Sequence, residues 1–542
     1  MPILESAISQ GAPAFEVNAQ AMQTALTELR QLEARTRAAS SKAAPSFAKR
    51  GQLLPRDRVA LLLDAGSPFL ELSTLAGYMQ DGQKPEKSIP GGGIIAGLGF
   101  IENTLCMVVA SDSGIEAGAL QPMGIEKMQR AQDIALENRL PFVNLGESAG
   151  ANLLKYKVEH FILGGGNFYR LAKLSAAGLP VVNVLHGSST AGGAYIPGLS
   201  DYVIMVRERA RAFLAGPPLL KAATGEIATD EELGGAEMHC GVSGLGEYLA
   251  EDDRHAIAFA RELMRKIDWN ASNRNVMAAF DFDAPAPRYS AEELMGVMPP
   301  DTKTPVDMRE VIARIVDDSD FLEFKASYGS ATLCGHAKLM GVSIGIISNL
   351  GPIDTAGATK ATHFIQSCCQ TQTPIIYLQN TTGYMVGKDA EQGGIIKHGS
   401  KMIQAVSNAT VPQITLLCGA SFGAGNYGMC GRSFGPRFVF SWPNSKTAVM
   451  GAEQAAGTMA TVMQASAARK GLEVPEFMLD NMRKQIIDTF ESQTSAFYTS
   501  GLLLDDGVID PRDTRRVLAL ALMACLQQQR SVQTMQFGVA RP

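Results

Sequence analysis

The chain has 542 residues, 46% hydrophobic and 19% charged, which fits a soluble globular protein too long for a single core. Its net charge of −6, with no basic run carrying interleaved aromatic residues, argues against a nucleic-acid partner. No C-x-x-C pair occurs among the eight cysteines, and the apolar run VLALALMACL is too short to cross a bilayer, so we expect a cytoplasmic protein with no membrane partner and no bound metal.

The first predicted helix covers residues 17–39, with leucines at helical spacing. A β-hairpin is predicted at 88–101, SIPGGGIIAGLGFI, where glycines alternate with apolar residues. Two longer segments, 127–153 and 171–198, then share one plan. Each predicts a helix, a Leu-Pro break, a short apolar strand and a turn of small residues.

The same pair of segments recurs at 362–387 and 401–429. The breaking prolines are separated by 39 residues in the first pair (180 − 141) and by 38 in the second (412 − 374). We therefore predict an α/β fold of two homologous halves, each a stacked helix–strand–turn repeat. The Pro-rich segment 283–305 is the predicted linker, and the predicted domains are residues 1–290 and 291–542.

The turns that end the second strand of each pair consist of small residues, AGGAY (191–195) and FGAGNYG (422–428). A strand that enters a helix through glycine leaves backbone N–H groups unpaired at the start of the helix. Two such groups near a carbonyl oxygen form an oxyanion hole, and we match Gly192 in the first half with Gly423 in the second. The alternative is close helix–strand packing without a ligand; no G-K-[ST] follows either turn, which disfavours a phosphate site.

The sequence offers few recognisable motifs for a side-chain nucleophile or a general base. The sequence has no G-x-S-x-G elbow, and its seven histidines form no H-x-x-x-H or H-E-x-x-H set. His186 precedes a glycine turn, but a satisfied or surface histidine is the favoured interpretation. The acid pairs Glu231–Glu232 and Asp252–Asp253 are interpreted as solvated helix ends. The chemistry is therefore expected to depend on backbone dipoles, as suits a thioester enolate.

Long motifs in this sequence resemble the β subunit of biotin-dependent acyl-CoA carboxylases, nearest to the 3-methylcrotonyl-CoA and geranyl-CoA branch. These motifs, in order, are STAGGAYIPGLSD, FLAGPPLLKAATGE, LQNTTGYMVG, SFGAGNYGMCGR and LLDDGVIDPRDTRRVL. The resemblance implies two crotonase-like domains, an N-terminal one for acyl-CoA and a C-terminal one for biotin. It also implies transfer of a carboxyl group from carboxybiotin to an acyl-CoA.

The same resemblance implies partners and assembly. Biotin is expected on a separate α subunit that carries the biotin carboxylase and biotin carrier functions, because this chain has no A-M-K-M biotinylation motif. A homo-oligomer is implied, at least a dimer with shared active sites, and the family's usual assembly predicts a hexamer within an α6β6 complex.

Site residues are carried over by motif, as expectations of the resemblance. Catalytic backbone donors are Gly192 and Gly193 for the thioester oxygen, and Gly423 and Ala424 for the ureido oxygen of biotin. Candidates for the cofactor and CoA are Lys127, Arg130, Ser148, Gly150, Ala151, Phe422 and Gly425. Candidates for the acyl group are Gly164, Gly165, Gly166, Phe168, Ala191, Ala194 and Tyr195.

The stretch FILGGGNFYR (161–170) departs from the methylcrotonyl branch, which has a bulky phenylalanine where we align Gly164. The missing ring would leave room for part of another isoprene unit, and each buried CH2 contributes about 0.8 kcal/mol. Geranyl-CoA, carboxylated at its γ-methyl group, is therefore the expected substrate, with 3-methylcrotonyl-CoA as the alternative. A flexible glycine loop would be the alternative to a large pocket.

Other classes of function remain open at this stage. The chain could belong to a biotin-linked decarboxylase, to a non-catalytic assembly subunit, or to a crotonase-type hydratase. Glycine turns in both halves argue against an assembly subunit, and the duplicated second site argues against a hydratase.

Overall fold

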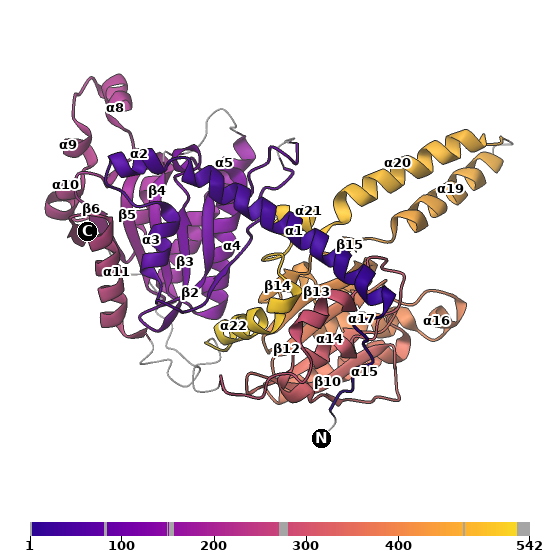
Figure 1. Cartoon of the computed structure of the whole chain (residues 1–542). Helices are drawn as coiled ribbons and strands as arrows, with labels where there is room; N and C mark the ends of the chain where they lie inside the picture. The colour runs from indigo at the N-terminus through magenta and orange to yellow at the C-terminus, as the bar shows by residue number, and fades with distance from the viewer. Residues whose placement is uncertain are drawn as a thin grey trace. The chain divides into compact units, whose positions relative to one another are not determined.

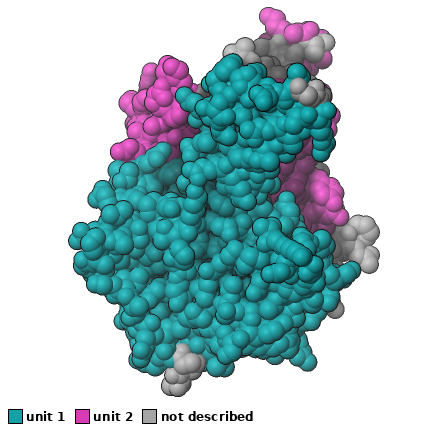
Figure 2. All heavy atoms as spheres, turned by 90° about the vertical axis from the view of Figure 1, so that its right-hand side faces the viewer, with its two compact units in different colours: residues 1–30, 279–500, 504–522 teal, residues 31–278, 501–503, 523–542 magenta. Residues whose placement is uncertain are grey.

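The computed structural model describes residues 3–80, 84–148, 150, 157–269, 280–469 and 472–527. It divides into two compact units, shown in Figure 1 and coloured separately in Figure 2. Unit 1 contains residues 1–30, 279–500 and 504–522, and unit 2 contains residues 31–278, 501–503 and 523–542. The predicted domains divided the chain once, after residue 290, whereas the first 30 residues belong to the unit that begins again at residue 279.

Unit 2 is built on an eight-stranded sheet with the order β1-β2-β3-β4-β5-β6-β8, and β7 pairs with β5. Its strands are β1 Phe69–Glu71, β2 Ile94–Ile101, β3 Thr104–Ser111, β4 Phe142–Ser148, β5 Val181–Thr190, β6 Tyr202–Val206, β7 Arg211–Phe213 and β8 Tyr248–Ala250. Its helices are α2 Ala44–Lys49, α3 Pro55–Leu62, α4 Pro122–Asn138, α5 Val158–Gly164, α6 Gly166–Ala176, α7 Tyr195–Gly198, α8 Pro217–Thr224, α9 Asp230–Gly234, α10 Ala236–Met238 and α11 Asp253–Ile267.

Unit 1 is built on a seven-stranded sheet with the order β14-β13-β12-β11-β10-β9, and β15 pairs with β13. Its strands are β9 Leu322–Glu323, β10 Thr332–Leu339, β11 Val342–Asn349, β12 Ile375–Thr381, β13 Gln413–Phe422, β14 Phe438–Ser441 and β15 Lys446–Ala448. Its helices are α13 Leu294–Val297, α14 Arg309–Ala313, α15 Thr355–Gln370, α16 Lys388–Gln392, α17 Ile395–Ser407, α18 Gly423–Gly428, α19 Ala452–Ala468 and α20 Glu476–Thr494.

Three helices contribute residues to both units: α1 Pro13–Ser41, α21 Ala496–Gly501 and α22 Thr514–Leu526. The predicted helix at 17–39 lies within α1, and the apolar run 517–526 lies within α22, where all ten residues are buried. Among the described helices, none has both the length and the apolar character needed to span a membrane.

The duplication predicted from the sequence is confirmed residue by residue. The four breaking prolines each stand immediately before a strand, where a residue without an N–H group can still offer its carbonyl to the neighbouring strand. That carbonyl accepts a hydrogen bond of 2.8–2.9 Å in all four cases: Met107 to Pro141, Phe142 to Pro180, Gly345 to Pro374 and Ile375 to Pro412. The same register shift also recurs, between Gly146 and Ser148 in β4 and between Gln379 and Thr381 in β12.

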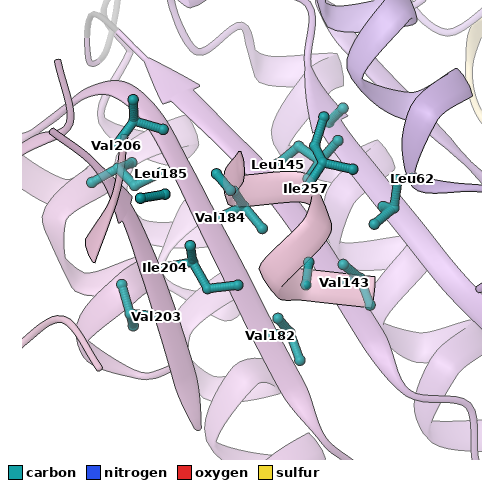
Figure 3. Close-up of a cluster of buried hydrophobic side chains, with 14 of the residues drawn as sticks. Leu62, Val143, Leu145, Val182, Val184, Leu185, Val203, Ile204, Val206 and Ile257 are labelled. Atoms are coloured by element: carbon teal, nitrogen blue, oxygen red, sulfur yellow. The ribbon is translucent and has the colours of Figure 1, made fainter. Parts of the chain in front are cut away.

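Alternate residues of the central strands of unit 2 form its main apolar cluster. Val143 and Leu145 of β4 and Val182 and Val184 of β5 meet Leu62 and Ile257, which come from α3 and α11 (Figure 3). The period-two spacing within each strand puts these side chains on one face of the sheet. The corresponding cluster of unit 1 joins β11 and β12 to α15 and α17.

Two predicted elements differ from the structure. The hairpin expected at 88–101 is formed by β2 and β3 instead, because residues 91–93 are three consecutive glycines with positive φ that turn the chain before β2 begins. Part of the predicted linker is also not open chain: Leu294, Met295 and Val297 of α13 are buried in unit 1.

Candidate active site

The strand-to-helix corner of unit 2 lies at the end of β5. Thr190 ends the strand, Ala191 has a left-handed backbone with φ +54°, and a short helical turn runs over Ala191–Ala194 before α7. The first N–H groups of a helical turn have no partner within that turn. Ala191 and Gly192 are exposed and Gly193 is buried, so the corner presents main chain with almost no side-chain cover.

The corner of unit 1 has the same backbone form. Phe422 ends β13, Gly423 has φ +55°, and α18 follows. The strand registers align Thr190 with Phe422, so Ala191 corresponds to Gly423 and the offset is 232 residues, as it is for Pro180 and Pro412. Matching Gly192 with Gly423 was therefore wrong by one residue, because the shared feature is the left-handed residue and not the glycine.

A cavity of about 600 Å³ opens beside the corner of unit 2. Its walls are mainly apolar and come from the start of α4, from α5, from α6 and from the corner itself. The lining residues are Leu120, Gln121, Pro122, Ile125, Met128, Lys157, His160, Phe161, Ile162, Gly164, Gly165, Asn167, Phe168, Ala191, Gly192, Gly193 and Ile196. The structure thus brings four acyl-group candidates (Gly164, Gly165, Phe168 and Ala191) to the same cavity as the catalytic candidates Gly192 and Gly193.

Three acyl-group candidates are not in this lining. A Cβ atom at Gly166 would lie 2.8 Å from Nη1 of Arg170 and 3.1 Å from Nε2 of Gln129, so this glycine is crowded by polar side chains. Tyr195 is half exposed and packs edge-on against Phe168, with ring centroids 5.8 Å apart. Ala194 lies in the same turn as the lining residues and is not one of them.

The three glycines join two helices. Gly164 ends α5, Gly166 begins α6, and Gly165 between them has ordinary helical angles, φ −58° and ψ −23°. None of the three has a positive φ, so backbone conformation does not require glycine here. A Cβ atom at Gly164 would lie 3.7 Å from Cδ1 of Ile125, on the wall formed by α4. The absence of side chains at Gly164 and Gly165 therefore contributes space to the cavity, whereas Gly166 does not line it.

The candidates for the cofactor and CoA have varied surroundings. The side chain of Lys127 is 2% exposed, and Nζ donates to the backbone oxygen of Ile94 at 2.7 Å, so meeting a CoA phosphate would require it to leave this site. Arg130 also lies largely inside, 3.6 Å from the Glu137 carboxylate. The hydroxyl of Ser148 donates to the Gly118 carbonyl and accepts from the Gly150 N–H, and Ala151 lies outside the described residues.

Close packing against the neighbouring turn requires a glycine at position 425, in unit 1. A Cβ atom there would lie 2.9 Å from Cα of Gly383 and 2.9 Å from Cγ2 of Thr381, which is closer than real Cβ atoms come. The corner of unit 1 therefore sits tightly on the turn after β12. Phe422 next to it is 7% exposed.

His186 lies on β5, four residues before the strand ends at Thr190, and is completely buried. Its Nδ1 atom is 2.9 Å from Oδ1 of Asp253, whereas its buried Nε2 atom has no hydrogen-bond partner among the described residues, so the interpretation of a satisfied histidine holds for one ring nitrogen only. Asp253 itself is 2% exposed, so its interpretation as a solvated helix end was wrong. Asp252 caps α11 through the His255 N–H, and this register turns Asp253 inward to the Arg58 guanidinium, 3.1 Å away.

Removing one member of this buried network should destabilise unit 2. Burial alone would raise the pKa of Asp253, but hydrogen bonds from His186 and Leu53 and the charge of Arg58 lower it to about 2. Asp253→Asn should cost about 2–3 kcal/mol at pH 7, because Arg58 then keeps only Glu147 as a charged partner and His186 loses its carboxylate. The native pKa lies below the unfolded value of about 3.9. The difference in unfolding free energy between the wild-type chain and Asp253→Asn is therefore fully present above pH 4 and shrinks as the pH falls toward 2.

Thermal unfolding of the wild-type chain and Asp253→Asn across this pH range would measure the effect. Asp252→Asn, which keeps a good N-cap residue, is the matched control and should lose at most about 1 kcal/mol. An equal loss in both variants, or a difference that does not depend on pH, would contradict the buried ion pair.

Comparisons with known proteins show the family to which this chain belongs. Residues 47–539 match the carboxyl transferase domain family. The chain is 47% identical to a probable biotin-dependent acyl-coenzyme A carboxylase beta2 subunit of Mycobacterium tuberculosis, over 96% of this chain and 97% of that one. It is 43% identical to a probable mitochondrial methylcrotonoyl-CoA carboxylase beta chain of Drosophila melanogaster, over 99% and 95%.

The chain is also similar to a solved structure, the geranyl-CoA carboxylase beta subunit of P. aeruginosa, with 49% identity, a TM-score of 0.92 and full coverage of both chains. This likeness, with the duplicated sheets, confirms the predicted fold of two crotonase-like domains. The chain belongs to the carboxyl transferase family and is the carboxyltransferase component of a biotin-dependent acyl-CoA carboxylase.

Proposed function

We propose that this chain transfers a carboxyl group to the γ-methyl carbon of a branched, unsaturated acyl-CoA, and that geranyl-CoA is the preferred substrate. The observation that carries the proposal is the mainly apolar cavity of about 600 Å³, which extends from the corner at Gly192 to the glycines at the α5–α6 junction. A cavity of this size and character suits an acyl chain longer than methylcrotonyl.

The corner supplies the electrostatic part of the reaction. Loss of a proton from the γ-methyl group gives a dienolate whose charge lies partly on the thioester oxygen. The N–H groups at Gly192 and Gly193 are proposed to donate to that oxygen. A fixed donor of this kind contributes about 3–4 kcal/mol to transition-state stability in a site that excludes water.

The acyl tail is proposed to lie between α4 and the α5–α6 junction. Ile125 and Met128 form one wall, and Gly164 and Gly165 leave the opposite side open. A geranyl tail has one isoprene unit more than methylcrotonyl and gains about 0.8 kcal/mol for each CH2 it buries. Gly166, Ala194 and Tyr195 are proposed to support these lining residues from behind.

Biotin, when bound, supplies the carboxyl group and is proposed to accept the substrate proton. Gly423 and Ala424 are the proposed donors to its ureido oxygen. The left-handed backbone at Gly423, φ +55°, supports this role because it is the feature this corner shares with the corner of unit 2. A Cβ atom at Gly423 would lie 3.1 Å from the Val449 carbonyl oxygen, so a side chain would be crowded there. Phe422 and Gly425 would fix the position of this corner, and Arg130, Ser148, Gly150 and Ala151 remain candidates for CoA.

The partner is proposed to be an α subunit that carries biotin, since the relatives named above are β subunits or beta chains of carboxylases. A homo-oligomer of at least two copies with shared active sites, and a hexamer within an α6β6 complex, are part of the same proposal, as is a cytoplasmic location.

A reconstituted complex of this chain with its biotin-carrying partner would test the proposal. With ATP and bicarbonate, we expect kcat/KM to be higher for geranyl-CoA than for methylcrotonyl-CoA. Preference for methylcrotonyl-CoA would favour the second candidate, to which the Drosophila melanogaster relative points. Carboxylation of neither substrate would overturn the proposal, and decarboxylation alone would favour a biotin-linked decarboxylase.

A further inference from the structure

Lys127 is a buried cation beside the proposed acyl cavity and does not line it. It lies on α4, and its side chain is 2% exposed. The Nζ atom donates to the backbone oxygens of Ile94, at 2.7 Å, and of Gly91, at 3.4 Å. Burial lowers its pKa to about 8, with Glu71, Arg56 and Asp112 as the charged groups around it.

The backbone oxygens that accept hydrogen bonds from Lys127 belong to Gly91, the first residue of a glycine turn, and to Ile94, which follows it. Gly91, Gly92 and Gly93 all have positive φ, at 99°, 62° and 69°. This turn packs main chain to main chain against the start of α4. A Cβ atom at Gly92 would lie 2.8 Å from the Gly124 nitrogen, and one at Gly124 would overlap the Gly92 oxygen.

The same part of α4 forms a wall of the cavity. Pro122, Ile125 and Met128 line it, and Ile125 faces Gly164 across it. The helix has Lys127 on the side turned to the glycine turn and Ile125 and Met128 on the side turned to the cavity. The position of the wall therefore depends on how firmly α4 is held on the glycine turn.

Unit 1 contains a buried lysine at the place that corresponds to Lys127, but its helix does not line the cavity described above. Lys360 of α15 is also completely buried, 3.6 Å from Glu323, and Arg309 pairs with Glu323 as Arg56 pairs with Glu71. A buried lysine at this place thus belongs to the duplicated fold. Only the copy in unit 2 lies on a helix that lines the cavity described above.

We propose that Lys127 is a positioning residue for the acyl cavity: its hydrogen bonds to the glycine turn 91–93 and to Ile94 hold the first half of α4 and so fix the wall that faces Gly164. The part of this inference that concerns acyl chains rests on the proposed function. The part that concerns α4 does not.

Lys127→Met tests the inference, with Lys360→Met as the matched control for loss of a buried lysine. We expect amide hydrogen exchange in residues 122–131 to become about tenfold faster in Lys127→Met, which corresponds to the loss of one hydrogen bond to a charged group. The ratio of kcat/KM for geranyl-CoA over methylcrotonyl-CoA should fall by about tenfold, because the longer chain makes more wall contacts. Lys360→Met should change neither quantity.

Gly92→Ala provides a second variant, since a Cβ atom there pushes the glycine turn away from α4 while Lys127 is retained. It should also lower the substrate ratio. Gly66→Ala should not, because Gly66 also has a positive φ, +78°, and within the part of the chain that the structure describes nothing but its chain neighbours lies within 4 Å of its Cβ. Unchanged exchange in α4 of Lys127→Met, or an equal fall in kcat/KM for both substrates, would overturn the inference. A wild-type complex inactive on both substrates would instead refute the proposed function, and the exchange measurement would still decide the role of Lys127.

Discussion

Gly192→Val should reduce carboxyl transfer by about 100- to 1,000-fold while the chain still folds. Valine keeps the backbone N–H, but its methyl groups would prevent the thioester oxygen from reaching it, and the fall has the size expected for loss of one oxyanion-hole contact. Among the described residues, and apart from the chain neighbours, the only atom within 4 Å of a Cβ at Gly192 is Cζ of Phe168, at 3.8 Å, so the first side-chain atom meets no clash there. The two valine methyl groups would extend into the cavity, where the thioester oxygen is proposed to meet the corner.

The matched control is Gly198→Val, in α7 a few residues farther along the chain. A Cβ atom at Gly198 would have no heavy atom of another described residue within 4 Å apart from its chain neighbours, and Gly198 is not one of the residues that line the cavity. Steady-state kinetics and thermal unfolding should be measured for both variants. Full activity of Gly192→Val would exclude the corner of unit 2 as the thioester site, and unfolding of both variants would show that the corner tolerates no side chain.

Gly164→Phe should reduce kcat/KM for geranyl-CoA by about 100-fold more than kcat/KM for methylcrotonyl-CoA. The ring would start 3.7 Å from Ile125 and fill the space between α4 and the α5–α6 junction. Exclusion of a few CH2 groups of the tail, at about 0.8 kcal/mol each, accounts for a change of this size. The measurement is a side-by-side comparison of the two substrates with the reconstituted complex.

Leu163→Phe is the appropriate control, because it adds a ring one residue earlier and away from the cavity. The Leu163 side chain is 67% exposed, and it is not one of the described lining residues. This variant should leave the substrate ratio unchanged. If Gly164→Phe keeps geranyl-CoA turnover, the glycines at 164–166 serve the helix junction and not the length of the acyl chain.

The duplicated architecture was predictable because it depends on local chemistry. Proline ends a helix and offers a strand only its carbonyl, so Pro141, Pro180, Pro374 and Pro412 mark the same point in four repeats. The small residues after β5 and β13 likewise indicate strand-to-helix corners where few side chains cover the main chain. Ile125 and Met128 are three residues apart on α4, but the predicted segment began only at residue 127, and nothing in the sequence shows that this face meets a cavity.

The one-residue error at the corners has a similar cause. The sequence aligns glycine with glycine, whereas the backbone aligns the left-handed residues, which are an alanine in unit 2 and a glycine in unit 1. Alanine rarely adopts a positive φ, so its identity gave no sign of that conformation. Strand pairing, which depends on distant residues, fixed the register.

The sequence alone predicted the two halves, their order of helices and strands, and the strand-to-helix corners made of small residues. These features depend on residues that are close together in the chain. The tertiary structure alone decided which charges are buried, because their partners are distant: Asp253 meets Arg58 across 195 positions, and Lys127 meets Ile94 across 33. A charged side chain on a helix looks the same in the sequence whether it faces water or a partner. Only the packed fold supplies the carbonyls or the opposite charge that let it leave water.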